Sequence, residues 1–181
     1  ASFLRFGSYQ IFAARQDNET LKILVGFTIK QHFPDLGKPS KETYLQFFEN
    51  VLNSTIEMLV HWQRIGFVHG VMNTDNMSIL GQTIDYGPYG WLEGYDHNWT
   101  PNTTDNQFKR YRYGAQIDMG LWNLYQLANT LYLLIGEAEG LEHILKSYNE
   151  KAQAQYLEMM RSKLGLYFDD KRDIELIRKY N

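Results

Sequence analysis

The sequence predicts a mainly helical fold of the α+β class, with one small β-hairpin near the middle of the chain. Two long segments, 40–65 and 116–136, repeat apolar residues every three or four positions, as the buried faces of helices do. Between them, residues 77–84 have a Gly-Gln pair at their centre, which indicates two short strands joined by a tight turn. The length of 181 residues suffices for a sizeable core, so we expect residues 1–181 to form a single domain.

The N-terminal part of the chain leads into the first long helix. Residues 1–15 are predicted as a loop entering a short extended segment, and residues 18–33 as a helix that Pro34 ends. Ser40 is a suitable N-cap for the long helix, because its hydroxyl can accept from free backbone N–H groups, and Gly66 is suited to end it. The predicted buried stripe of this helix is Tyr44, Phe48, Val51, Leu52, Thr55, Leu59 and Trp62. We expect this helix at the centre of the domain.

A long loop and further helices follow. Residues 86–113 are rich in Gly, Pro, Asn, Tyr and Trp, and their aromatic side chains favour an ordered loop in which Trp91, Tyr95, Trp99 and Phe108 are buried. The next helix, 116–136, has the predicted apolar stripe Ile117, Leu121, Leu124, Tyr125, Ala128, Leu131, Tyr132 and Ile135. Residues 140–165 predict one or two helices, and residues 169–180 a charged last helix.

Composition excludes several classes of function. The net charge of −3 and the pI near 6.0 give no reason to expect a nucleic-acid partner. Without cysteine there is no disulfide framework and no thiolate chemistry. No apolar run approaches the ~20 residues that span a bilayer, and no signal-peptide pattern opens the chain, so we expect no membrane partner and a cytosolic origin. The glycosylation sequons at Asn98 and Asn102 are therefore interpreted as chance matches.

Two polar clusters interrupt the apolar runs. Asn73, Asp75 and Asn76 form the first, and Asp85 opens the second at a Gly-Pro turn. Carboxylate and amide oxygens suit Mg²⁺, a hard ion that takes one or two protein oxygens and fills its shell with phosphates and water. Because the hairpin predicted at 77–84 would return Asp85 to the side of Asn76, we expect these two residues to hold one metal ion.

The spacing of the clusters matches two motifs of protein kinases. The kinase catalytic loop H-R-D-x-x-x-x-N supplies a base and a metal-binding Asn, and D-F-G supplies a metal-binding Asp. In this overlay His69 takes the first position of the octet, Asn76 the last, and Asp85 the Asp of D-F-G. The base position holds Val71, which cannot accept a proton. The pattern predicts a kinase-like C-lobe without its usual base, in which His69 supports the loop structurally.

The chain also resembles a known family in a long and specific motif. The motif is His-Gly-Val-Met-Asn-Thr-Asp-Asn-Met-Ser-Ile-Leu-Gly at 69–81, followed by Thr-Ile-Asp-Tyr-Gly-Pro at 83–88, and it closely resembles the selenoprotein O family. The similarity extends over 2–15, 95–105 and 116–127. Members of this family look like pseudokinases and transfer AMP from ATP to protein hydroxyls, with the nucleotide flipped relative to a kinase. The resemblance implies a protein adenylyltransferase acting on Ser, Thr or Tyr, with ATP as substrate, Mg²⁺ or Mn²⁺ as cofactor and proteins as acceptors.

The resemblance assigns roles to four residues. Asn76 and Asp85 would hold the metal, Asp75 would be the acid/base residue, and Arg5 would contact the ATP phosphates together with a second Arg that lies before this chain begins. From the residues alone, an Arg among apolar neighbours such as Arg5 is more often a stem packed on the surface with its head in water. Asp75 has the alternative interpretation of a loop-bracing residue. The resemblance also implies a cytoplasmic bacterial protein, or a mitochondrial one in a eukaryote.

Parts of a complete kinase-like enzyme are not found in the sequence. No Gly-rich phosphate loop, strand lysine or partnering Glu precedes Ser40. We therefore expect a C-lobe fragment of a larger protein, without the N-lobe and inactive alone, because half of the nucleotide cleft would be open to water. Two alternatives stay open. One is a kinase-like phosphotransferase in which Asp75 replaces the base. The other is a non-catalytic pseudokinase interaction module, against which the joint presence of Asn76 and Asp85 argues.

Overall fold

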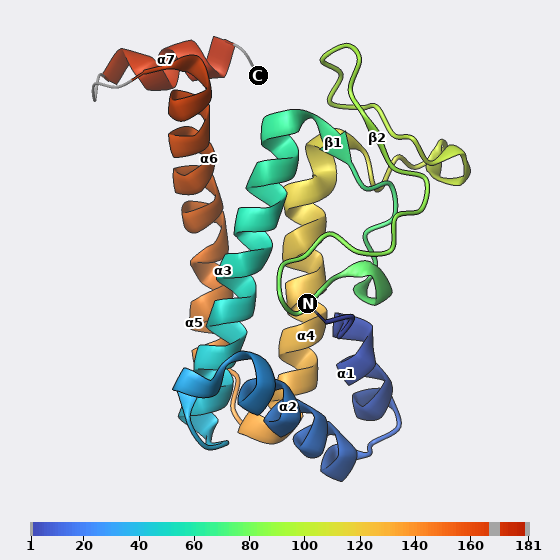
Figure 1. The fold of residues 1–181 in the computed structure, drawn as a ribbon, viewed down its shortest axis with the longest axis vertical. Helices are drawn as coiled ribbons and strands as arrows, with labels where there is room; N and C mark the ends of the chain where they lie inside the picture. The colour runs from blue at the N-terminus through green and yellow to red at the C-terminus, as the bar shows by residue number, and fades with distance from the viewer. Residues whose placement is uncertain (1, 167–170, 180–181) are drawn as a thin grey trace.

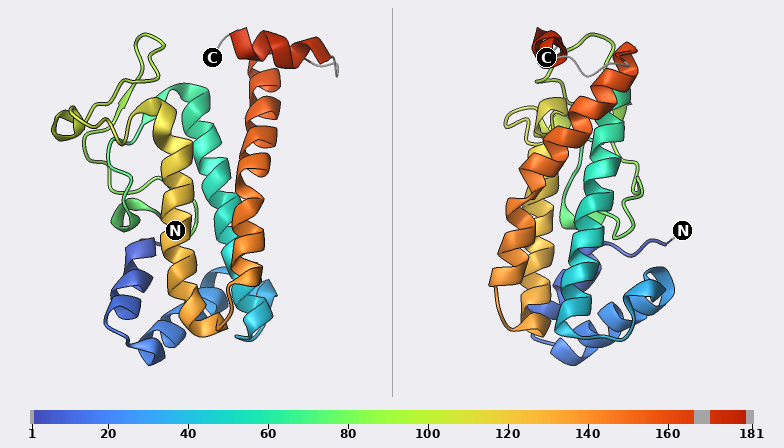
Figure 2. Two further views of the ribbon diagram at one scale, coloured as in Figure 1. Left: turned by 180° about the vertical axis from the view of Figure 1, so that it is seen from behind. Right: turned by 90° about the vertical axis from the view of Figure 1, so that its left-hand side faces the viewer.

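The computed structural model describes residues 2–166 and 171–179, and over these residues the chain is mainly helical, as predicted. The helices are α1 (Phe6–Ala14), α2 (Asn18–His32), α3 (Lys41–Ile65), α4 (Gln116–Ile135), α5 (Glu139–Lys146), α6 (Tyr148–Leu164) and α7 (Lys171–Lys179). The strands β1 (Phe67–Val68) and β2 (Gly90–Trp91) pair antiparallel, with Phe67 opposite Trp91. Figure 1 and Figure 2 show α3, α4 and α6 side by side, with α1 and α2 at one end. No helix in the described ranges is both long enough and apolar enough to cross a membrane.

The long helix α3 forms as the sequence predicts. The hydroxyl of Ser40 accepts from the backbone N–H of Thr43 at 3.2 Å, and Gly66 ends the helix in the left-handed conformation at φ 68°. All seven residues of its predicted stripe are buried. Because α3 packs against both α4 and α6, it lies at the centre of the described domain.

The helix α4 crosses α3 closely, and its buried face differs from the predicted one. A side chain at Gly120 would collide with Leu59 of α3, so the absence of a side chain permits the close approach. Tyr125 and Tyr132 of the predicted stripe are instead exposed. Three of the buried residues of α4 are polar, namely Gln116, Asn123 and Thr130. The other buried residues of this helix are Gly120, Leu124, Leu127, Ala128, Leu131 and Ile135. Apolar periodicity could not identify these polar side chains as buried.

Two local predictions are wrong, one at the N-terminus and one near the middle of the chain. Residues 6–14 form the helix α1 rather than an extended segment. The hairpin predicted at 77–84 does not form, because Ser78 pairs with Arg5 in an isolated antiparallel bridge. The N–H of Phe6 donates to the carbonyl of Met77, and the N–H of Ile79 donates to the carbonyl of Leu4, both at 3.0 Å. The extended partner of this segment therefore comes from the start of the chain.

The segment after Ser78 turns against α3. Gly81 has φ 62°, and a Cβ there would lie 2.8 Å from the backbone carbon of Ser54. The indole N–H of Trp62 donates to the hydroxyl of Thr83 at 2.9 Å. These contacts hold the turn on α3 and leave Asp85 next to the N-terminal segment.

Hydrogen bonds help to hold the loop at 86–113. Three of the aromatic residues predicted as buried are exposed, Trp91, Tyr95 and Phe108. The Asp105 carboxylate instead accepts from two backbone N–H groups, at Arg110 and Tyr111. Outside this loop, residues 140–165, for which one or two helices are predicted, form two. The last predicted helix agrees over Lys171–Lys179, while residues 169, 170 and 180 lie outside the described ranges.

Candidate functional site

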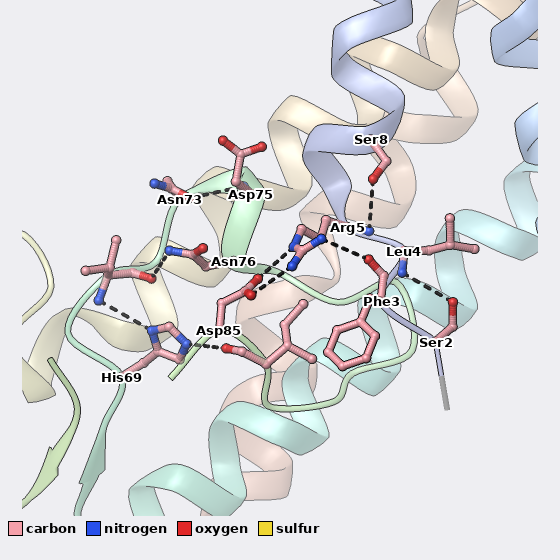
Figure 3. Close-up of polar contacts among 12 residues, drawn as sticks. Ser2, Phe3, Leu4, Arg5, Ser8, His69, Asn73, Asp75, Asn76 and Asp85 are labelled. Carbon is pink, nitrogen blue, oxygen red and sulfur yellow. Dashed lines mark hydrogen bonds and ion pairs between the residues drawn. The ribbon is translucent and has the colours of Figure 1, made fainter. Parts of the chain in front are cut away.

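An open pocket of about 430 Å³ lies between the start of α1 and the loops that follow β1. It is lined by Arg5, Gly7, Ser8, Ile11, Asp75, Asn76 and Asp85. All four residues singled out from the sequence therefore meet at one pocket (Figure 3). A larger groove of about 740 Å³ lies between α3 and α6, but none of the four residues lines it. The chemistry of the lining, rather than its size, identifies the smaller pocket as the candidate site.

Arg5 and Asp85 face each other in this pocket. The Arg5 guanidinium donates from Nε to Oδ2 at 2.7 Å and from Nη2 to Oδ1 at 2.8 Å. This two-point geometry is the one in which a planar guanidinium binds a carboxylate most strongly. The hydrogen bond from Arg5 lowers the pKa of Asp85, and the same bond raises the pKa of Arg5. Asp85 is therefore an anion at neutral pH.

The backbone before and at Asp85 is fixed by His69. Asp85 has φ 55°, a left-handed conformation that costs a residue with a side chain on the order of 1 kcal/mol. The buried His69 ring bonds through Nε2 to the carbonyl of Ile84 at 2.8 Å, and Nδ1 accepts from the N–H of Val71 at 3.4 Å. Burial lowers the pKa of His69, so the ring is neutral and Nε2 carries its proton. His69 thus joins the two polar clusters, which agrees with its predicted supporting role.

Asn76 lies in a short 3₁₀ turn, η2 (Thr74–Asn76), at the edge of the pocket. Its Nδ2 donates to the carbonyl of Val71 at 3.0 Å, and no hydrogen bond among the described residues engages Oδ1. The side-chain oxygen of Asn73 caps the turn by accepting from the N–H of Asp75 at 3.0 Å. The amide of Asn76 is therefore oriented by the hydrogen bond of its nitrogen, and its oxygen has no hydrogen-bond partner in the described part of the chain.

Asp75 is exposed beside the first turn of α1. Within the described ranges, no hydrogen bond ties its carboxylate to another group. The turn is fastened to α1 through its neighbour instead, since the hydroxyl of Thr74 donates to the side-chain oxygen of Gln10 at 2.7 Å. The bracing contacts seen in this loop thus belong to Asn73 and Thr74 rather than to the Asp75 carboxylate.

Three buried amide side chains that the sequence did not assign to the site also hold the loop. Gln116 donates to the carbonyl of Phe67 at 2.9 Å and accepts from the N–H of His69 at 3.1 Å. Asn123 donates to the carbonyl of Met72, and Asn102 to that of Gly70, both at 2.9 Å. The only signal in the sequence was that two of them interrupt the apolar pattern of α4. Asn102 is buried with its amide nitrogen in use, which agrees with the chance interpretation of its sequon.

The donor set suits a hard divalent ion completed by a phosphate ligand. Within the described residues, no three His, Cys, Asp or Glu side chains form a cluster that could hold a metal ion. Asn76 and Asp85 offer one amide oxygen and one carboxylate, which fit Mg²⁺ or Mn²⁺ only if other ligands fill the shell. Phosphate oxygens of a nucleotide would do so, and the neighbouring guanidinium of Arg5 would favour them.

An amide oxygen, two carboxylates and a guanidinium around one pocket fit the chemistry of proteins that transfer phosphoryl or nucleotidyl groups. The chain belongs to the family described as "Protein adenylyltransferase SelO", whose model matches residues 1–180. This match confirms the resemblance to the selenoprotein O family that the motif at 69–81 indicated.

Curated bacterial relatives carry the name protein nucleotidyltransferase YdiU. The protein from Flavobacterium johnsoniae is 58% identical over 176 residues, which cover 97% of this chain and 34% of that protein. The protein from Rhodopirellula baltica is 53% identical over 97% of this chain and 34% of its own length. The protein from Nitrosospira multiformis is 52% identical over 91% of this chain and 30% of its own length. The chain thus spans about a third of the curated relatives that it matches.

Proposed function

We propose that this chain is the kinase-like C-lobe of a protein adenylyltransferase, which transfers AMP from ATP to Ser, Thr or Tyr hydroxyls of other proteins. The observation that carries the proposal is the pocket at which Arg5, Asp75, Asn76 and Asp85 meet. The family description and the names of the relatives support a nucleotidyl rather than a phosphoryl transfer.

The active protein in this proposal is longer than the chain, and we call it the parent protein. Support comes from the length of the relatives, of which the chain matches about a third. The pocket fits this view, because it is shallow and open and would leave a nucleotide largely in water. A second lobe over the pocket would exclude water and strengthen every electrostatic interaction inside it.

The proposed roles follow from the chemistry of each side chain. Asn76 and Asp85 would hold a Mg²⁺ or Mn²⁺ ion, whose chemistry is to neutralise charge on the phosphates. Arg5 would donate to phosphate oxygens, for which its planar fork is suited. Its present partner is Asp85, so binding of a nucleotide would redistribute the hydrogen bonds between these two side chains.

Asp75 is the proposed general base. The acceptor hydroxyl oxygen forms a bond to the α-phosphorus of ATP, the bond from that phosphorus to the bridging oxygen breaks, and pyrophosphate leaves. The proton of the hydroxyl passes to the Asp75 carboxylate, which is exposed at the pocket and free of bracing contacts in the described part of the chain. Val71 stands where a kinase has its base and cannot take this role.

Labelled ATP tests the proposal against its nearest alternative. If the parent protein is an adenylyltransferase, an acceptor protein gains label from the α-phosphate of ATP and none from the γ-phosphate. Label from the γ-phosphate alone would identify a kinase-like phosphotransferase and contradict the proposal.

A non-catalytic interaction module is the second candidate function. One observation favours it: Tyr86, Tyr89 and Trp91 are exposed aromatic side chains that contact one another directly after Asp85. Exposed apolar patches of this kind often mark protein-binding surfaces. The absence of either label on any acceptor, together with retained binding of a partner protein, would favour this candidate.

A further inference from the structure

Gly7 lies in the first turn of α1, where the carboxylate of Asp75 rests directly against it. A Cβ added at Gly7 would collide with Oδ1 of Asp75 and would lie 3.1 Å from Cγ and 3.4 Å from Cα of the same residue. The Asp75 carboxylate therefore occupies the volume that any side chain at position 7 would need.

The backbone does not explain the glycine at this position. Gly7 is part of an α-helix and is absent from the residues with positive φ, so an L-residue could adopt its conformation. Glycine is less favourable than alanine within a helix, because it loses more conformational freedom on folding. Helix formation alone would thus favour a side chain at this position, and the contact with Asp75 is the feature that opposes it.

The backbone of Asp75 cannot easily withdraw from α1. Its N–H is held by the side chain of Asn73, and the preceding Thr74 is bonded to Gln10 of α1. A methyl group at position 7 would therefore be accommodated by rotation of the Asp75 side chain, which moves the carboxylate and leaves the fold in place.

We propose that Gly7 is a positioning residue for the transfer reaction: its missing side chain allows the Asp75 carboxylate to lie over the first turn of α1, at the pocket shared with Arg5 and Asp85. The inference rests on the proposed function, in which Asp75 is the general base. It adds that the contact between η2 and α1 sets the position of the Asp75 carboxylate. A larger residue at position 7 would therefore impair catalysis rather than folding.

The test is Gly7→Ala in the parent protein. The transfer rate should fall toward that of Asp75→Ala, which is a loss of roughly 10²–10⁴-fold if the base is displaced completely. The melting temperature should be no lower than that of the wild type, and ATP affinity should be nearly unchanged. A matched control is Gly26→Ala in α2, where a Cβ would lie 3.5 Å from Pro39, an ordinary contact. This control gains the same helix propensity and should keep the wild-type transfer rate.

A double variant separates positioning from a general structural effect. If Gly7 acts through Asp75, Gly7→Ala should reduce transfer in the wild type and have no further effect in Asp75→Ala. An equal loss in both backgrounds, a wild-type rate in Gly7→Ala, or a joint fall in melting temperature and ATP affinity would contradict the inference. A normal transfer rate in Asp75→Ala would instead refute the base assignment of the proposed function, so the two failures are distinguishable.

Discussion

Arg5 and Asp85 form a two-point ion pair across 80 residues of sequence, with donor–acceptor distances of 2.7 and 2.8 Å. The two side chains belong to different parts of the proposed mechanism, since Arg5 is assigned to phosphate and Asp85 to the metal ion. The ion pair holds both side chains in the pocket. It also competes with ligand binding, because phosphate would bind Arg5 in place of Asp85, and the metal ion would bind Asp85 in place of Arg5. Removal of Arg5 should therefore change the affinities for ATP and for the metal ion in opposite directions, which removal of an arginine that only packs on the surface would not do.

Arg5→Ala should weaken ATP binding and strengthen binding of the metal alone. Loss of a charge-assisted hydrogen bond to phosphate costs about 1.5–3 kcal/mol, which corresponds to roughly 10–100-fold in ATP affinity. The Asp85 carboxylate, released from its partner, should bind Mn²⁺ more tightly in the absence of nucleotide. Titration calorimetry of the parent protein with ATP and with Mn²⁺ measures both effects. Unchanged ATP affinity would show that Arg5 does not contact the phosphates and that its stem only packs on the surface.

Asp85→Asn should abolish metal-dependent ATP binding and transfer together, because it removes the charged ligand while keeping the size of the side chain. Asn76→Ala should have the same effect less severely. Asp35→Asn, which removes an exposed carboxylate away from the pocket, is the matched control and should behave as wild type. Metal-dependent ATP binding that persists in Asp85→Asn would place the ion elsewhere.

Stability should fall in mild acid because of His69. Burial lowers the pKa of His69 from its ordinary value of 6.5, so the unfolded chain binds a proton at a higher pH than the folded one. This contribution to stability is complete above pH 6.5 and is lost as the pH falls toward the folded pKa. Denaturant unfolding above and below pH 6.5 should show a smaller loss in His69→Gln than in the wild type. His61→Gln, at an exposed position of α3, should retain the wild-type loss.

Asn102→Asp should destabilise the protein by about 1–3 kcal/mol, since it removes the donor to the carbonyl of Gly70 and places a carboxylate oxygen against it. The buried site and the tight packing of Pro101 on Gly70 leave little room for relaxation. Asn98→Asp makes the same chemical change at an exposed position of the same loop. Urea unfolding of both variants measures the difference, and equal stabilities would show that the Asn102 contact contributes nothing.

The parts of the fold that the sequence predicts well are those set by local signals. The helix α3 has a capping serine, a C-terminal glycine and a continuous apolar stripe. Both ends of the helix in the structure lie within one residue of the predicted ends. The helix α1 has no such stripe. Phe6 and Tyr9 are buried, whereas Ile11 is exposed, so no single apolar face indicates a helix.

The site could be predicted in its members but not in its geometry. The motif spacing singles out Asn76 and Asp85, and the family resemblance adds Asp75; all three line one pocket. The turn signal at Gly81 could not show that Ser78 pairs with Arg5 rather than with its own neighbours, because strand pairing is a long-range property. For the same reason, the sequence shows neither the ion pair of Arg5 with Asp85 nor the contact of Gly7 with Asp75.

The most direct test of the proposed function is the intact mass of an acceptor protein after incubation with the parent protein, ATP and Mg²⁺. We expect a mass increase equal to one AMP group, which is absent when the parent protein carries Asp85→Asn and greatly reduced when it carries Asp75→Ala. A mass increase equal to one phosphate, or an AMP adduct that forms equally well with both variants, would contradict the proposed function.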